Sequence, residues 1–324
     1  GGYYTVDRFG SGIASHGTYA IARSTTVPTG QGFGYSFKMD CTTADTSLAA
    51  GAEVTFYQVI EGQNLQRIKK GTSSADSLTL SFWIRSNLTG TLTAELFDAD
   101  NTRQISQTFT ISSADTFEKK TLTFAGDTSG AITNDNGASL YVIIYLAAGS
   151  NFTSGTLNTS WAHATSANRV SSSNINIASS TSNEVLITGM QLEQGTAGTD
   201  FEFEPYDITL QKCKRYYQKN QAESPYDRFF MGFCVTTDDS RHPVNFHPQM
   251  RGIPTLETGG TFAVLTAAEV GQSVSSIAID TNTDSSQRAT LQVAAAATTL
   301  VAGNGTALAA LNDASTYIAF TAEL

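Results

Sequence analysis

Short stretches with a period of two residues run through the first two hundred positions of the chain. Apolar and polar residues alternate over 36–41, 54–60, 78–85, 92–97 and 140–146. This is the spacing of β-strands with one buried face, because successive side chains of a strand point to opposite sides. Turn residues such as Asn and Gly separate these stretches. The pattern therefore predicts two packed sheets, either a sandwich or a jelly roll.

A strand with an internal break closes this region. Val185, Ile187, Met190 and Leu192 are its apolar residues, and Gly189 falls between the two pairs. A glycine inside a strand pattern indicates a bulge or a close approach of the backbone to another group. We therefore predict a bulged strand here.

A change of period follows the bulged strand. Leu210, Cys213 and Tyr217 recur at helical spacing over one or two turns, and alternating stretches then return as far as the last residue. We predict an all-β protein with three parts. These are an N-terminal jelly-roll β-sandwich over 1–206, a helical linker over 207–223 and a smaller C-terminal β-sandwich tip domain over 224–324.

The composition excludes several classes of partner. Charged residues make up only 15% of the chain and the net charge is −10, whereas nucleic acids and anionic membranes select clustered Lys and Arg. No apolar run is long enough to span a bilayer, so membrane insertion is not expected. The three cysteines form no Cys-x-x-Cys pair, which implies neither a zinc site nor a disulfide framework. Such usage is typical of assembly in a reducing cytosol.

The order of motifs around the bulged strand resembles the junction found in many tailed-phage tail-fibre and tail-spike proteins. In that family a jelly roll closes with a Gln-Leu-Glu-x-Gly strand, and a helix ending in Cys-x-Arg-Tyr-Tyr leads into a distal tip. The segments that carry the resemblance are 187–196 (ITGMQLEQGT), 200–207 (DFEFEPYD), 213–217 (CKRYY), 78–85, 117–124, 250–255 and 318–324.

The resemblance implies a role as well as a fold. It implies a homotrimeric virion structural protein, the distal part of a tail fibre, assembled in the host cytoplasm and joined to other tail proteins. Its carbohydrate-binding-module-like jelly roll, its tip, or both would recognise a glycan on the host surface. The chain does not begin with Met, and we expect it to be a fragment of a longer fibre.

Aromatic and charged residues on the polar faces of the strands are the candidate chemistry. An aromatic ring can stack on the apolar face of a pyranose while neighbouring Arg, carboxylate or amide groups bond the hydroxyls. If the strands over 78–85 and 140–146 share a sheet, their outward side chains line one groove. The predicted carbohydrate-binding residues are Trp83, Arg85, Tyr141, Tyr145, Tyr57, Glu95 and Trp161.

The two tryptophans and the tyrosines Tyr141 and Tyr145 also have a purely structural interpretation, in which they pack within the protein and meet no ligand. Trp83 could pack under the polar stretch 147–183 or against a neighbouring chain. Trp161 lies inside that stretch and could anchor it instead of meeting a ligand.

Catalytic motifs are missing from the sequence. It contains no Gly-x-Ser-x-Gly, His-Glu-x-x-His or phosphate loop, and His242 and His247 are better interpreted as structural residues. We therefore predict a protein that is not an enzyme. Two alternatives stay open: a polysaccharide depolymerase that uses carboxylate pairs such as Glu202 and Glu204 or Asp98 and Asp100, and a virion decoration protein without any ligand.

No cofactor is implied, and calcium is the one metal to consider. Loop carboxylates such as Asp7, Glu193 and Asp200 could gather where the first and last strands of the jelly roll meet. Calcium needs six to eight oxygen ligands, however, and the sequence does not show that these residues converge.

Overall fold

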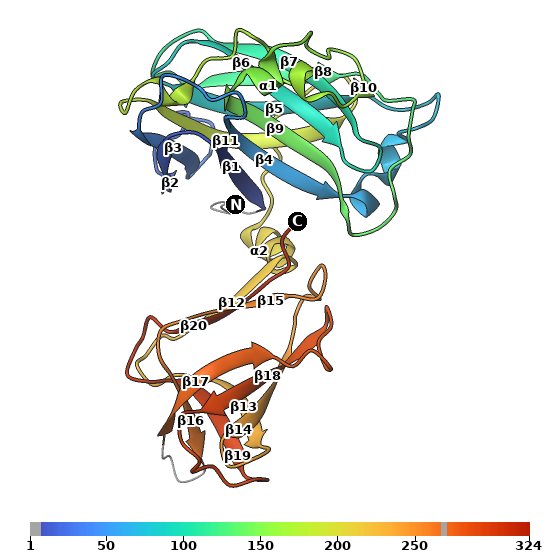
Figure 1. The fold of residues 1–324 in the computed structure, drawn as a ribbon. Helices are drawn as coiled ribbons and strands as arrows, with labels where there is room; N and C mark the ends of the chain where they lie inside the picture. The colour runs from blue at the N-terminus through green and yellow to red at the C-terminus, as the bar shows by residue number, and fades with distance from the viewer. Residues whose placement is uncertain (1–7, 267–270) are drawn as a thin grey trace. The chain divides into compact units, whose positions relative to one another are not determined.

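A computed structural model describes residues 8–266 and 271–324 of the chain (Figure 1). The chain divides into two compact units, Gly1–Phe203 and Glu204–Glu323, and each is described separately. Both units are built almost entirely from antiparallel strands, which confirms the predicted all-β class. Of the helices within the described residues, none has the length and apolarity that crossing a bilayer requires.

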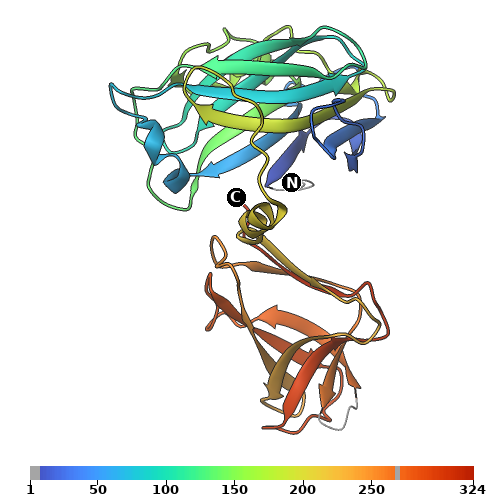
Figure 2. The ribbon, with the colours of Figure 1, turned by 180° about the vertical axis from the view of Figure 1, so that it is seen from behind.

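The first unit is a sandwich of two sheets that face each other (Figures 1 and 2). One sheet has six strands in the order β1 (Phe9–Ala14), β4 (Glu53–Glu61), β9 (Ala138–Ala148), β6 (Gly90–Asp98), β7 (Arg103–Ile111) and β10 (Ala162–His163). The other has five strands in the order β2 (Thr18–Ser24), β3 (Ser36–Thr43), β11 (Glu184–Gln194), β5 (Leu78–Ser86) and β8 (Glu118–Phe124). Short helical turns connect the strands: η1 (Gly62–Asn64), η2 (Gln66–Ile68), α1 (Ser150–Thr153), η3 (Ser166–Asn168) and η4 (Ile177–Ser179).

The core of this unit is formed by the inward residue of each alternating pair. On β5, Leu80, Phe82 and Ile84 are fully buried, whereas Trp83 and Arg85 on the outer face are half-buried. The inward residues of β6 are buried as well, but so is Glu95 on its outer face. The predicted core faces of both strands are confirmed. Removing these apolar side chains from water is the main force that holds the two sheets together.

The break predicted in the last strand of the sandwich is a β-bulge. The pairing of β11 with β5 shifts register between Thr188 and Gln191, and Gly189 at the break has φ +60°. An added Cβ at Gly189 would lie 2.4 Å from Cζ of Phe33. Only glycine therefore meets both demands of this position, the left-handed backbone and the close ring.

The second unit combines a helix, a small sheet and a barrel. The helix α2 (Tyr206–Lys214) precedes a three-stranded sheet in the order β12 (Tyr217–Gln221), β20 (Tyr317–Thr321) and β15 (Thr255–Gly259). The closed barrel has the order β13 (Arg228–Cys234), β14 (Asp239–Asn245), β18 (Arg288–Ala295), β17 (Gly271–Ile279), β16 (Phe262–Thr266) and β19 (Gly305–Ala310).

Two details of this unit differ from the sequence-based prediction. The helix ends at Lys214, and the expected remainder of the linker to residue 223 contains β12, because its backbone pairs with β20 from the far end of the chain. The tip is a barrel instead of two packed sheets, because β19 pairs with both β13 and β16 and closes the ring. A barrel and a sandwich share the same alternation along each strand, so the pattern alone does not separate them.

Replacing Gly189 with Ala tests the bulge. The left-handed backbone costs roughly 1–2 kcal/mol for a residue with a Cβ, and displacing the Phe33 ring adds to this cost. Gly30→Ala is the matched control, because Gly30 has φ +75° but an added Cβ would meet nothing within 4 Å. We expect both variants to be less stable than the parent, and Gly189→Ala to be clearly the less stable of the two.

The measurement is urea unfolding followed by tryptophan fluorescence. The chain has two tryptophans, Trp83 and Trp161, and both lie in the first unit, so the signal reports on that unit alone. Equal losses of stability in the two variants would show that Phe33 does not constrain the bulge.

Candidate functional site

A groove of about 410 Å³ lies over the outer face of the five-stranded sheet. Trp83 and Arg85 from β5 form its floor. One wall is the connection between β2 and β3, through residues 26–29 and Gln31, and the other is the segment 115–117 that leads into β8. Three separate parts of the chain therefore meet around one tryptophan ring.

The guanidinium group at the floor of the groove is held on two sides. Arg85 donates from Nε to the backbone oxygen of Asp115 at 3.1 Å and from Nη2 to its Oδ1 at 2.7 Å. Arg85 Nη1 also donates to Glu184 Oε1 on the neighbouring strand β11. These three bonds leave two of the five N–H donors of the guanidinium for another partner.

The acidic partners of Arg85 are themselves fixed. Asp115 has φ +58° and donates its backbone N–H to the oxygen of Ser86 at 2.8 Å, which ties the segment to the end of β5. Burial by itself raises the pKa of the Glu184 carboxyl, but hydrogen bonds from Lys38 and Arg85 outweigh this and hold the pKa below its usual value. Glu184 is therefore ionised at neutral pH and keeps Arg85 in place.

The outer face of the six-stranded sheet is closed. Glu95 on β6 is fully buried, and Arg169 from the long segment between β9 and β11 bonds both of its oxygens, at 3.0 Å from Nε to Oε1 and 2.8 Å from Nη2 to Oε2. The Tyr145 hydroxyl donates to Glu95 Oε2 at 2.8 Å. Burial raises the pKa of Tyr145 well above its ordinary value, and the neighbouring Glu95 raises it further, so the phenol stays protonated.

The strands over 78–85 and 140–146 do not share a sheet, so the single groove predicted on that condition does not form. Trp83 and Arg85 lie in the five-stranded sheet, whereas Tyr141 and Tyr145 lie on β9 of the six-stranded sheet. Tyr145 and Glu95 are sealed beneath Arg169, and a sugar does not reach them. The prediction failed because alternation marks which side chains leave the core but not which sheet each strand joins.

Two other predicted residues lie at the margin of the closed face. The rings of Tyr57 and Tyr141 are half-buried with centroids 6.4 Å apart, and Phe97 lies 5.9 Å from Tyr141. They form a small aromatic cluster with the residues that Arg169 covers. Their packing is accounted for without a ligand.

Trp161 has the contacts of an anchor. Its indole Nε1 donates to the backbone oxygen of Ala125 at 2.6 Å, and Nζ of Lys70 lies 5.3 Å from its ring centroid. Lys70 is buried and bonds Asp98 at 2.5 Å and Asp127 at 3.0 Å. These contacts favour the loop-anchor interpretation of Trp161 over direct contact with a ligand.

Two other candidate groups, Asp98 and His242, already have partners within the protein. Asp98 belongs to the buried ion pair with Lys70, and His242 is buried with its ring nitrogens 3.0 Å from Ser240 Oγ and 3.2 Å from the oxygen of Phe230. Burial lowers the pKa of His242 more than the Phe230 oxygen raises it, so the ring is neutral at pH 7.

The calcium hypothesis gains no support from the described residues. Among them, no group of three or more His, Cys, Asp or Glu side chains is placed to hold a metal ion. Glu193 accepts hydrogen bonds from the backbone N–H of Thr199 at 2.9 Å and from its hydroxyl at 2.5 Å, and Asp200 is exposed. Asp7 lies outside the described residues.

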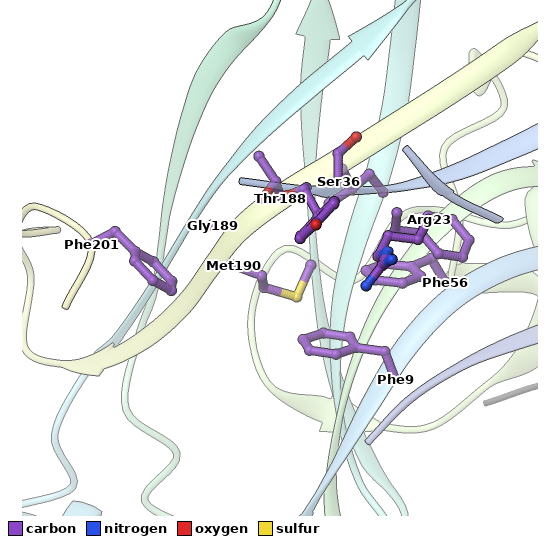
Figure 3. A pocket seen from close by; sticks show the side chains of 11 residues that line it. Phe9, Arg23, Ser36, Phe56, Thr188, Gly189, Met190 and Phe201 are labelled. Carbon is purple, nitrogen blue, oxygen red and sulfur yellow. Dashed lines mark hydrogen bonds between the residues drawn. The ribbon is translucent and has the colours of Figure 1, made fainter. Parts of the chain in front are cut away.

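A second cavity, of about 240 Å³, opens at one end of the sandwich between the two sheets (Figure 3). Its wall includes Phe9 and Phe56 from the six-stranded sheet and Phe37 and Met190 from the five-stranded sheet, and it is mostly apolar. Arg23 is the charged residue in this wall. No sequence pattern marks this cavity, because its residues converge from six separate segments.

Asp115 and the segment 26–31 are parts of the first groove that no sequence pattern predicted. Neither belongs to an alternating stretch, so periodicity gives no signal for them. The outward position of Arg85 is the one signal that points to Asp115. An arginine that becomes half-buried there needs a carboxylate from elsewhere in the chain.

No protein-family model and no curated protein sequence matches the chain. Solved structures with some similarity include an enzymatically active domain of tailspike protein 4 of bacteriophage CBA120, at 15% identity and a TM-score of 0.34 over 58% of this chain and 19% of that one. Another is a family 11 carbohydrate-binding module from Clostridium thermocellum in complex with a mixed-linked tetrasaccharide, at 10% identity and a TM-score of 0.30 over 60% and 92% of the two chains. Likeness this weak assigns neither a ligand nor a site.

Removing Arg169 tests the ion pair that holds the covering segment on the outer face of the six-stranded sheet. Arg169→Ala leaves the Glu95 carboxylate buried without its cation, which we expect to cost about 3–5 kcal/mol in the free energy of unfolding. The double variant Glu95→Leu, Arg169→Met removes both charges and should recover most of that loss. Arg67→Ala, at an exposed arginine on η2, is the control and should change stability by less than about 0.5 kcal/mol.

Urea unfolding followed by tryptophan fluorescence measures all three variants. A loss for Arg169→Ala no larger than that for Arg67→Ala would contradict the role assigned to this ion pair.

Proposed function

We propose that this protein binds a glycan in the groove over Trp83 and Arg85, and that it is the distal part of a tailed-phage tail fibre. The observation that carries the first proposal is the placement of a half-buried tryptophan ring beside a fixed guanidinium and an exposed carboxylate. The resemblance of the segments around residues 187–217 to tail-fibre junctions supports the second.

The groove offers what a sugar ring needs. The Trp83 ring presents a flat apolar surface on which the axial C–H groups of a pyranose stack. The two unused N–H groups of Arg85 donate to sugar hydroxyls, and the exposed carboxylate of Asp115 accepts from them. Because both charged groups are held by the protein before binding, little conformational entropy is lost when the ligand arrives.

The same groove supports binding over cleavage. Glycoside hydrolysis ordinarily uses two carboxyl groups about 5 to 9.5 Å apart. Asp115 is the single carboxylate among the described residues that line the groove, and it is paired with Arg85. This arrangement favours a receptor-binding protein over a depolymerase.

The tail-fibre proposal places no demand for tight binding on a single groove. The resemblance implies a homotrimer attached to other tail proteins in the virion, so three grooves would act on one host surface. Linked sites bind far more tightly together than each does alone, and a shallow groove then suffices for attachment.

A glycan array with the purified protein tests the binding proposal. We expect Trp83→Ala to lose about tenfold or more in affinity, because burying a large apolar side chain against a ligand contributes on the order of 1.5–3 kcal/mol. Asp115→Ala should also weaken binding, through lost bonds to the hydroxyls and a freed Arg85. Trp161→Ala is the matched control, which should lower stability but leave the affinity of the folded protein unchanged.

Three outcomes would count against the proposal. Wild-type protein that binds no glycan on the array would indicate a decoration protein without a ligand. Unchanged affinity in Trp83→Ala would place the site elsewhere. Release of new reducing ends from a bound polysaccharide would identify a depolymerase.

A further inference from the structure

The cavity at the end of the sandwich is chemically unlike the groove over Trp83. Its inner wall is made by aromatic and aliphatic side chains, among them Phe9, Phe37, Phe56 and Met190. Phe37 and Phe56 are buried parts of the sandwich core with ring centroids 4.5 Å apart, and Phe9 stacks on Phe56 at 5.0 Å. The cavity is therefore an opening into the core between the first strands of the two sheets.

The serine and threonine hydroxyl groups in this wall already have hydrogen-bond partners. Ser36 Oγ donates to the backbone oxygen of Thr26 at 2.7 Å, and Thr188 Oγ1 donates to the backbone oxygen of Tyr35 at 2.9 Å. A sugar buried here would leave several of its own hydroxyls without partners, and each unmade bond costs free energy. The ligand that suits this wall is mostly apolar.

Arg23 is the exception to the apolar wall. Its guanidinium carbon lies 4.1 Å from the centroid of the Tyr35 ring, and no Asp or Glu among the described residues forms an ion pair with it. Figure 3 shows the guanidinium of Arg23 facing the same space as Phe9 and Met190. The cavity thus combines an apolar interior with one cation that is held by stacking.

We propose that this cavity binds a medium-chain monocarboxylic acid, with the alkyl chain inside and the carboxylate on Arg23. The charge of the head group follows from the unpaired guanidinium, which bonds a carboxylate through two parallel N–H groups. The length follows from the volume. A 150 Å³ apolar cavity accommodates benzene, so about 240 Å³ accommodates an alkyl chain of about eight to ten carbons.

A chain-length series tests the interior of the cavity. Isothermal titration of the full chain with hexanoate, octanoate, decanoate and dodecanoate, each below its critical micelle concentration, should show about fourfold tighter binding per added methylene. The gain should stop near decanoate, where the cavity is full. Octan-1-ol, which has no charge, should bind at least about tenfold more weakly than octanoate.

Two variants test the wall itself. Arg23→Gln removes the positive charge and keeps a polar side chain, and should weaken octanoate binding about tenfold while leaving octanol unchanged. Arg67→Gln is the matched control and should bind octanoate like the parent. Met190→Trp should fill the cavity and abolish binding of both ligands, with an unchanged unfolding midpoint showing that the fold persists.

The results that would overturn the proposal are equally specific. Absence of saturable octanoate binding would overturn it, as would equal affinity in Arg23→Gln, or affinity that rises with chain length without a limit. Binding to vesicles of phosphatidylglycerol without binding to the free acids would replace it with a membrane contact. If Met190→Trp does not fold, the Arg23 pair and the chain-length series decide. Trp83→Ala should bind octanoate normally, so the glycan proposal and this one fail separately.

Discussion

The ion pair between Glu95 and Arg169 holds one segment of the chain over the outer face of the six-stranded sheet, so that face is not open to a ligand. A buried carboxylate is tolerated only with a cation and hydrogen bonds around it, and Arg169 and Tyr145 supply both. Arg169 belongs to the long polar segment between β9 and β11, so satisfying Glu95 requires this segment to lie across the six-stranded sheet. The outer face of that sheet is therefore occupied by the chain itself.

The closed face is secured at its other end by a second buried charge cluster. Lys70 bonds both Asp98 and Asp127, and Arg103 bonds Asp127 at 2.7 Å. Trp161 lies against Lys70 and bonds the chain at Ala125, which fixes the segment near β10. Two separate ionic anchors thus hold one covering layer, and the five-stranded sheet keeps the outer face on which Trp83 is accessible.

The two cavities of the first unit differ because of what their polar groups already do. In the groove, Arg85 and Asp115 hold each other, but Asp115 stays exposed and two N–H groups of Arg85 have no partner in the described residues. In the cavity at the end of the sandwich, the hydroxyls of Ser36 and Thr188 are bonded to backbone oxygens, and aromatic rings fill the remaining wall. One sandwich can therefore present a polar site and an apolar site without competition between them.

Local patterns in the sequence were enough to predict the strands, their inward faces and the bulge at Gly189. These are local properties, because the direction of each side chain follows from its position along the strand and a left-handed residue needs glycine. The outward positions of Trp83 and Arg85 were predictable for the same reason. The placement of Tyr145 and Glu95 was not, because it depends on which strands pair and on where a distant arginine comes to lie.

Three features depend on contacts between distant segments: the pairing of strands, the covering of one sheet and the closure of the second unit into a barrel. Alternation looks the same for an outer face that meets water and for one that lies under a loop. The partner that distinguishes them, Arg169 for Glu95 or Asp115 for Arg85, is separated from it by tens of residues and has no periodic signal of its own. Pairing across such distances is settled by the burial and charge balance of the whole unit, which no single stretch of sequence contains.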